Sequence, residues 1–65
     1  MLKDARKKKG LSQKSLAERL GITQSYLSRL ENRDKYDKKV TVDLAKRISE
    51  ELDLKLIDVV LYFCN

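Results

Sequence analysis

Apolar residues recur three and four positions apart in five segments of the chain, separated by glycine, small polar residues or runs of charge. This spacing is typical of helices with one buried side, and the sequence contains no proline, so it predicts an all-α fold of five short helices. We expect the first three over residues 2–9, 13–20 and 24–32, a fourth that begins at 41 and a fifth over 55–63. Gly10 and Gly21 suit the ends of the first two helices, and Ser12 and Thr23 suit the N-caps of the second and third.

The fourth helix has a single apolar side, formed by Leu44, Ala45, Ile48 and Leu52. These residues align because successive positions are about 100° apart around a helix. The helix is therefore predicted to cover a core. Residues 33–39, RDKYDKK, have no apolar period and are predicted to form a charged loop.

The fifth helix is apolar around much more of its circumference. Its apolar residues span an arc of roughly 200°, against a usual stripe of somewhat over 100°, and one core cannot cover both flanks. Either the helix is buried between others or its outer flank contacts a second copy of the chain. Because 65 residues are close to the lower limit for a single stable core, we favour the second interpretation. The predicted dimer interface consists of Val59, Tyr62 and Phe63.

The segment LAERLGITQSYLSRLEN combines two short helices with a polar strip on the second. Ala17 allows the helices to approach closely, Gly21 can adopt the positive φ of a sharp turn, and Ile22 fills the angle between them. The side opposite Leu27 and Leu30 is polar. It consists of Ser25, Ser28, Arg29 and Asn32, with Gln24 beside them. A solvated surface would more often carry Glu and Lys, whereas Gln pairs well with adenine and Arg with guanine in the major groove of DNA. The pattern therefore favours DNA recognition by this helix.

The distribution of charge agrees with that interpretation. Residues 1–39 hold 12 Lys and Arg against 5 Asp and Glu, a net charge of +7, whereas residues 40–65 hold 3 against 5, a net charge of −2. A basic surface attracts nucleic acid through the release of counterions. A surplus of lysine also favours solubility, so charge alone does not identify the partner.

Composition argues against catalysis, metal binding and membrane insertion. The sequence has no histidine, and Cys64 is its only cysteine, which excludes an internal disulfide, a Cys/His zinc site and a Ser-His or Cys-His pair. The longest largely apolar run, residues 54–64, contains Lys55 and Asp58 and is too short to span a bilayer, and the N-terminus lacks the apolar region of a signal peptide. We therefore expect one cytoplasmic domain over residues 1–65, not an enzyme, with no cofactor, metal, membrane or small-molecule substrate.

The stretch LSQKSLAERLGITQSYLSRLEN resembles the helix-turn-helix of the lambda repressor/Cro-like family, also called the Xre family. The resemblance covers about residues 2–56. It implies a compact five-helix, lambda repressor-like domain with the helix-turn-helix at its second and third helices. It also implies a transcriptional regulator that binds a pseudo-palindromic operator as a homodimer, with the third helix in the major groove of double-stranded DNA.

The resemblance assigns roles to individual residues. The base-reading positions are Gln24, Ser25, Ser28 and Arg29. The positions expected to contact DNA phosphates are Gln13, Thr23, Tyr26 and Asn32. Gln13 resembles the family glutamine that bonds a phosphate and braces the recognition helix, and its place at the start of a helix favours this role. Tyr26 lies beside the apolar side of its helix, so packing and contact with DNA are both open. Arg6 and Glu31 look like the structural ion pair that joins the first and third helices of the family.

The segment after Asn32 departs from the family pattern. Members commonly continue with glycine and, a few residues later, proline, whereas this chain has Arg33 and a longer loop before Thr41. The basic residues of the loop either bind phosphates that flank the groove or belong to a solvated loop with Tyr36 at its tip. We assign phosphate contact to Arg33, Lys35 and Lys38, with Lys39 as a further candidate.

The sequence thus predicts a sequence-specific DNA-binding transcriptional regulator, and more narrowly a repressor. The alternative is a helical protein-interaction module, antitoxin-like or an adaptor, that uses its apolar fifth helix as the working surface. The chain stops just after an apolar segment, which fits both a complete Cro-like protein and the N-terminal portion of a longer repressor.

Overall fold

The computed structural model describes residues 1–32 and 40–64, and within these ranges it contains five α-helices and no strand. They are α1 (Leu2–Lys8), α2 (Gln13–Leu20), α3 (Gln24–Glu31), α4 (Val42–Leu52) and α5 (Leu56–Cys64). The predicted all-α, five-helix fold is confirmed, and the helix bounds lie within one residue of those expected from the sequence.

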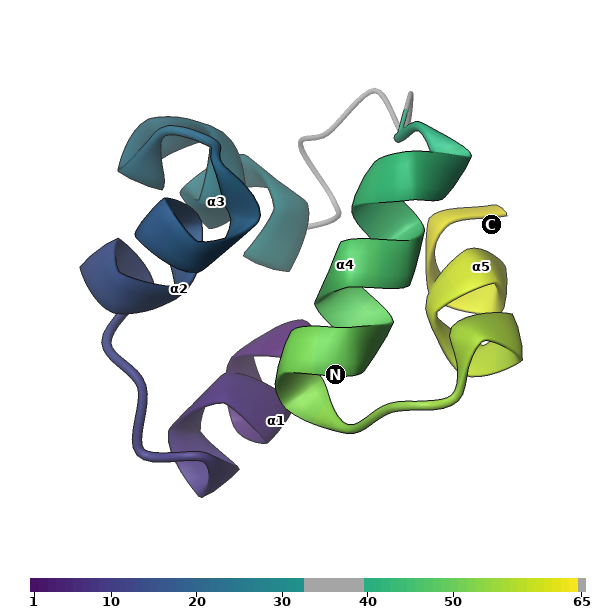
Figure 1. Cartoon of the computed structure of the whole chain (residues 1–65), viewed down its shortest axis with the longest axis horizontal. Helices are drawn as coiled ribbons and strands as arrows, with labels where there is room; N and C mark the ends of the chain where they lie inside the picture. Colours follow the sequence, from purple (N-terminus) through teal and green to yellow (C-terminus); the bar gives the residue numbers. More distant parts are fainter. Residues whose placement is uncertain (33–39, 65) are drawn as a thin grey trace.

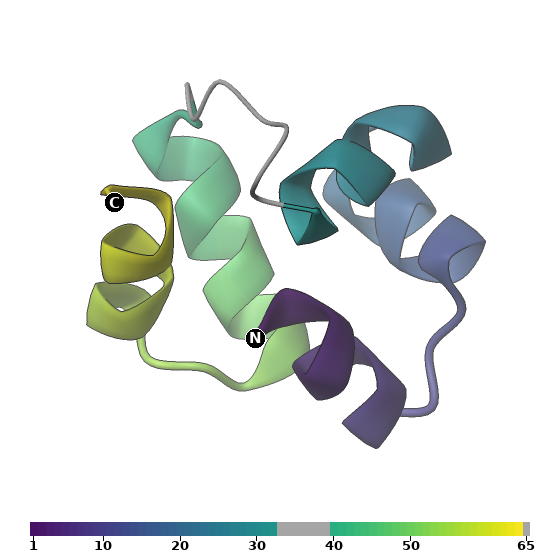
Figure 2. The same ribbon diagram turned by 180° about the vertical axis from the view of Figure 1, so that it is seen from behind.

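The helices are arranged around α4. In both views α2 and α3 lie on one side of α4, α5 lies on the other side, and α1 lies near the C-terminal end of α4 (Figures 1 and 2). The principal contacts join α4 to α5, α2 to α3 and α4, and α1 to α3. As a result α3 lies at the edge of the bundle, with one side against the other helices and one side open.

Local side-chain chemistry sets most of the helix ends. Ser12, Thr23 and Thr41 each accept a hydrogen bond from the backbone N–H three residues later, at 3.0–3.1 Å. Each hydroxyl satisfies an N–H group that has no partner within the first turn of the helix. Gly10 and Gly21 follow α1 and α2 with φ values of +71° and +72°, in the left-handed region that glycine adopts without steric cost.

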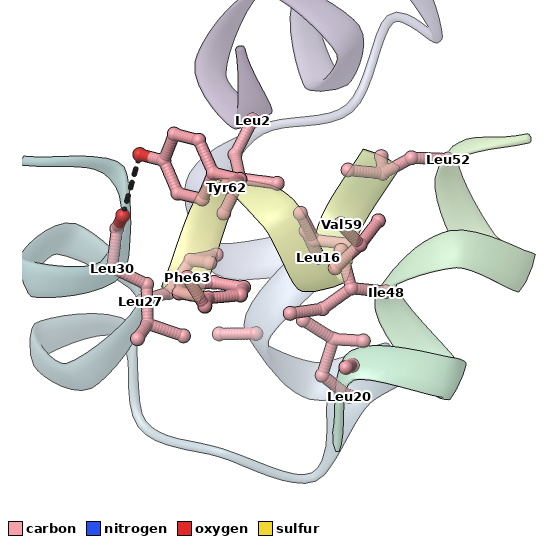
Figure 3. Close-up of a cluster of buried hydrophobic side chains, with 12 residues drawn as sticks. Leu2, Leu16, Leu20, Leu27, Leu30, Ile48, Leu52, Val59, Tyr62 and Phe63 are labelled. Carbon is pink, nitrogen blue, oxygen red and sulfur yellow. Dashed lines mark hydrogen bonds between the residues drawn. The ribbon is translucent and has the colours of Figure 1, made fainter. Parts of the chain in front are cut away.

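The hydrophobic core draws on all five helices (Figure 3). Its fully buried side chains are Leu2, Leu16, Leu20, Leu27, Leu30, Ile48 and Val59. Burial of an aliphatic side chain of this size contributes about 1.5–3 kcal/mol. Leu27 and Leu30 therefore fix the inner side of α3 and, with it, the direction of the outer side.

α5 buries the flank that the sequence analysis predicted to lie outermost. Val59, Tyr62 and Phe63 are only 0%, 8% and 8% exposed, so the prediction that they form a dimer interface was wrong. The inward orientation buries two aromatic rings, which pack edge to face with centroids 4.9 Å apart, and it gives the Tyr62 hydroxyl a backbone carbonyl to bind. The apolar residues left outside are Leu56, Ile57 and Leu61, which are 39%, 58% and 56% exposed.

Candidate nucleic-acid interface

A tight turn of three residues, 21–23, joins α2 to α3. The backbone N–H of Ile22 donates to the carbonyl of Ala17 at 3.0 Å, which closes the end of α2, and Thr23 then caps α3. Ala17 is buried and Ile22 packs against the core from the rim. The turn therefore fixes the angle between the two helices with its backbone, and the apolar side chains beside it hold that angle.

The outer side of α3 is open to solvent along its whole length. Gln24, Ser25, Ser28 and Arg29, the four residues predicted to read bases, are all exposed. Thr23 and Asn32, at the two ends of the helix, are exposed as well. The structure thus brings together amide, hydroxyl and guanidinium groups on a single helical surface, and we call these four residues of α3 the reading face.

Gln13 connects the start of α2 to both ends of α3. Its Nε2 donates to Oε1 of Glu31 at 3.2 Å, and its Oε1 accepts a hydrogen bond from Nε2 of Gln24 at 3.4 Å. A carboxylate only accepts hydrogen bonds, so Glu31 fixes which end of the Gln13 amide faces Gln24. The half-buried Gln13 thereby restrains one side chain of the reading face before any partner is present.

Arg6 and Glu31 form a shielded ion pair between α1 and α3. Arg6 Nε donates to Glu31 Oε2 at 2.7 Å and Arg6 Nη2 donates to Glu31 Oε1 at 3.2 Å, while the two side chains are only 9% and 5% exposed. A third donor of the same guanidinium, Nη1, binds the carbonyl of Leu11 at 3.0 Å. The guanidinium group of Arg6 thus joins α1, the turn that follows it and the C-terminal end of α3.

Tyr26 lies at the border between the core and the surface. It is partly buried and packs against the core cluster. It also lines an open hollow of about 370 Å³, whose other lining residues are Leu20, Gly21, Ile22, Thr41, Asp43, Leu44 and Arg47. Both roles expected for Tyr26, packing and contact with DNA, fit this location.

Lys3 is a candidate that the sequence analysis did not single out. A polar hollow of about 310 Å³ opens beside the reading face, and Lys3 lines it together with Gln13, Ser28, Glu31 and Asn32. Lys3 precedes Arg6 by one helical turn, so the expected ion pair of Arg6 with α3 was a signal that Lys3 faces the same helix. Its ammonium group adds a positive charge at the edge of the reading face.

Several predicted phosphate contacts fall between α3 and α4. Arg33, Lys35, Lys38 and Lys39, with Tyr36, lie outside the described residues.

In the part of the chain that the structure describes, no group of three or more His, Cys, Asp or Glu residues is placed to hold a metal ion. None of the helices in that part is both long enough and apolar enough to cross a membrane.

Comparisons with known proteins agree with the geometry of α2 and α3. A family model described as helix-turn-helix matches residues 2–59. No curated protein and no solved structure matched the chain significantly. The matched segment contains α1 to α4 and the start of α5, so it includes the whole α2–α3 arrangement.

Proposed function

Because the chain belongs to the helix-turn-helix family, in its Cro/C1 type, we propose that it is a sequence-specific transcriptional regulator whose α3 reads DNA in the major groove. The fold is the all-α, lambda repressor-like fold of that family. Its members are DNA-binding regulators and are generally not enzymes. The finer points, namely which helix reads bases and how the protein acts at a promoter, are our proposal.

The observation that carries the proposal is the division of α3 into two sides. Leu27 and Leu30 are fully buried, while all four residues of the reading face are exposed. A helix of 8 residues is about 12 Å long, and the major groove is about 12 Å wide, so its exposed side can approach base edges.

The chemistry of the reading face suggests which groups it recognises. Gln24 can form a paired contact with adenine and Arg29 with guanine, and the short side chains of Ser25 and Ser28 allow a close backbone approach. Phosphates on either side would be held by a flanking set of polar and basic residues. This set comprises Gln13, Thr23, Tyr26, Asn32, Arg33, Lys35 and Lys38.

We further propose that the protein acts in the cytoplasm as a homodimeric repressor that binds a pseudo-palindromic operator. The exposed Ile57 and Leu61 of α5 support self-association, because adjacent exposed apolar residues are favourable to bury against a second copy. Occupancy of a promoter by such a dimer would block RNA polymerase. The interface proposed here uses the outer side of α5 in place of the buried residues predicted from the sequence.

Selection of bound duplexes from a random pool, followed by sequencing, tests the proposal. We expect two related half-sites, and we expect Arg29→Ala to cost about 1–3 kcal/mol at one base pair of each half-site. Lys55→Ala, at an exposed position between α4 and α5, is the control and should leave the selected sequence unchanged. Equal loss of affinity for selected and random DNA on Arg29→Ala would contradict base reading by α3.

A second candidate function follows from the exposed apolar side of α5. Leu56, Ile57 and Leu61 would be the working surface of a protein-interaction module, and the basic N-terminal part would then serve solubility. Titration of a fluorescent random duplex at two salt concentrations separates the two functions. A DNA-binding regulator should bind with steep salt dependence, whereas an interaction module should bind little at either concentration.

A further inference from the structure

The C-terminal end of α3 is held by a side chain from α5. The hydroxyl of Tyr62 donates a hydrogen bond to the carbonyl oxygen of Leu30 at 2.9 Å and lies 3.5 Å from that of Glu31 (Figure 3). The last four carbonyls of a helix have no partner within the helix. Leu30 and Glu31 are the last two residues of α3, so the Tyr62 hydroxyl supplies a donor where the helix itself has none.

This contact is shielded and its donor is firmly placed. Tyr62 is 8% exposed, and its ring meets that of Phe63 at an interplanar angle of 84°. A tyrosine side chain has few rotatable bonds, so a ring packed in the core leaves its hydroxyl little freedom. Water does not compete for a bond in this position as it would at the surface. The hydroxyl therefore acts as a fixed point against which the last turn of α3 is set.

The two halves of the reading face share Gln13 as a support but differ in their other contacts, which are the Thr23 cap at the start of α3 and Tyr62 at its end. Gln24 and Ser25 follow the Thr23 cap, and Gln24 is bound by Gln13. Ser28 and Arg29 belong to the last turn, which Arg6 and Gln13 hold through the Glu31 side chain and Tyr62 holds through the Leu30 backbone carbonyl. A helix of 8 residues is not stable alone in water, so its contacts with the rest of the protein decide where its last turn lies. Loss of a contact at one end should therefore affect that end first.

We propose that Tyr62 is a positioning residue for DNA reading, whose hydroxyl sets the last turn of α3 and thereby aims Ser28 and Arg29. This inference rests on the proposed function of α3. It assigns a part in base recognition to a residue of α5 that is only 8% exposed and does not belong to the reading face. It also makes α5, the helix proposed for self-association, a direct support of the reading helix.

Tyr62→Phe tests the proposal because it removes the hydroxyl and keeps the ring. The matched control is Ile48→Val in α4. It removes one methyl group from a side chain that is 1% exposed, so it weakens the core, but it leaves the hydrogen bond to the Leu30 carbonyl in place. Duplexes would be selected by the wild type, by both variants and by Gln24→Ala and Arg29→Ala, at a temperature where circular dichroism shows every protein folded. The two alanine variants identify the base pairs read by each half of the face.

We expect Tyr62→Phe to lose about fivefold in affinity for the selected duplex, roughly the effect of one hydrogen bond, with unchanged affinity for random DNA. The lost preference should lie at the base pairs affected by Arg29→Ala and not at those affected by Gln24→Ala. Ile48→Val should keep the wild-type base preference at both sets of base pairs. An unaltered selected sequence for Tyr62→Phe, or an equal loss at both sets, would overturn the proposal.

Amide hydrogen exchange tests the same contact without DNA and so separates this inference from the proposed function. In Tyr62→Phe, the amides in the last turn of α3 should exchange faster relative to those of α2 than they do in Ile48→Val. Absence of that difference would overturn the inference even if the wild type selects a defined operator. If the wild type selects no sequence at all, the proposed function fails, and with it the part that we assign to Tyr62 in base recognition.

Discussion

Glu31 is the residue at which the supports of α3 meet. Its carboxylate accepts two hydrogen bonds from Arg6 of α1 and one from Gln13 of α2, although its side chain is only 5% exposed. A carboxylate is costly to bury unless donors surround it, and these three donors offset that cost. The same arrangement orients Gln13 toward Gln24, so a residue that is closed to solvent helps to prepare the reading face.

Arg6→Ala should therefore destabilise the fold. The variant leaves the Glu31 carboxylate shielded without its strongest donor, and we expect a loss of about 3 kcal/mol in the free energy of unfolding. Lys7→Ala, at the next and exposed position of α1, should change it by less than about 0.5 kcal/mol. Thermal unfolding followed by circular dichroism measures both variants. An unchanged melting temperature for Arg6→Ala would show that the pair has no structural role.

At the level of elements, local signals made the helices predictable, whereas the orientation of α5 depends on packing between residues far apart in the sequence. Ser12, Thr23 and Gly21 act within a few residues of themselves, so their effects could be predicted from the sequence. The apolar arc of α5 allows two orientations, and the observed one buries Val59, Tyr62 and Phe63 in the core and brings the Tyr62 hydroxyl to the carbonyl of Leu30, a residue 32 positions earlier. Periodicity carries no information about that contact.

The end of α4 and the role of Lys3 were not predicted either. Asp53 closes α4 with φ +54°, although left-handed backbone is uncommon for residues other than glycine, and the N–H of Leu54 then reaches the carbonyl of Ser49 at 2.9 Å. Lys3 reads in the sequence as one of many surface lysines. The expected ion pair of Arg6 indicates that Lys3, one turn earlier, faces α3, but its place beside Gln13 and Asn32 depends on how α1 packs against α3.

A pair of substitutions on α5 tests its orientation. Val59→Glu places a carboxylate at a position that is 0% exposed and should cost more than about 3 kcal/mol of stability. Leu61→Glu, at a position that is 56% exposed, should change stability by no more than about 0.5 kcal/mol at a protein concentration low enough for the wild type to be monomeric, so that loss of self-association does not contribute. Chemical denaturation of the two variants gives the comparison. The opposite ranking would mean that the flank predicted from the sequence is the outer one after all.

At the scale of the whole molecule, the fold separates two kinds of surface. The reading face of α3 and the exposed apolar side of α5 are carried by helices on opposite sides of α4 (Figures 1 and 2). The net charge of +7 belongs to residues 1–39, which include α3, and the net charge of −2 to residues 40–65, which include α5. This division allows one copy of the chain to face DNA while it contacts a second copy.

Self-association should therefore depend on the outer side of α5. We expect the wild-type protein to sediment as a dimer and Leu61→Glu to sediment as a folded monomer, because the substitution places like charges in the proposed interface. Leu61→Met keeps the apolar character and similar volume and should remain dimeric. Analytical ultracentrifugation across a range of concentrations measures all three proteins. A monomeric wild type at every concentration would remove the homodimer from the proposal.

We propose above all that the exposed side of α3 is the surface that contacts DNA. Titration of isotope-labelled protein with the selected duplex, followed by NMR, tests it most directly because each backbone amide reports on its own surroundings. We expect the largest chemical-shift changes at Gln24, Ser25, Ser28 and Arg29, with smaller changes at Gln13. Changes confined to α5, with those four amides unmoved, would contradict this proposal.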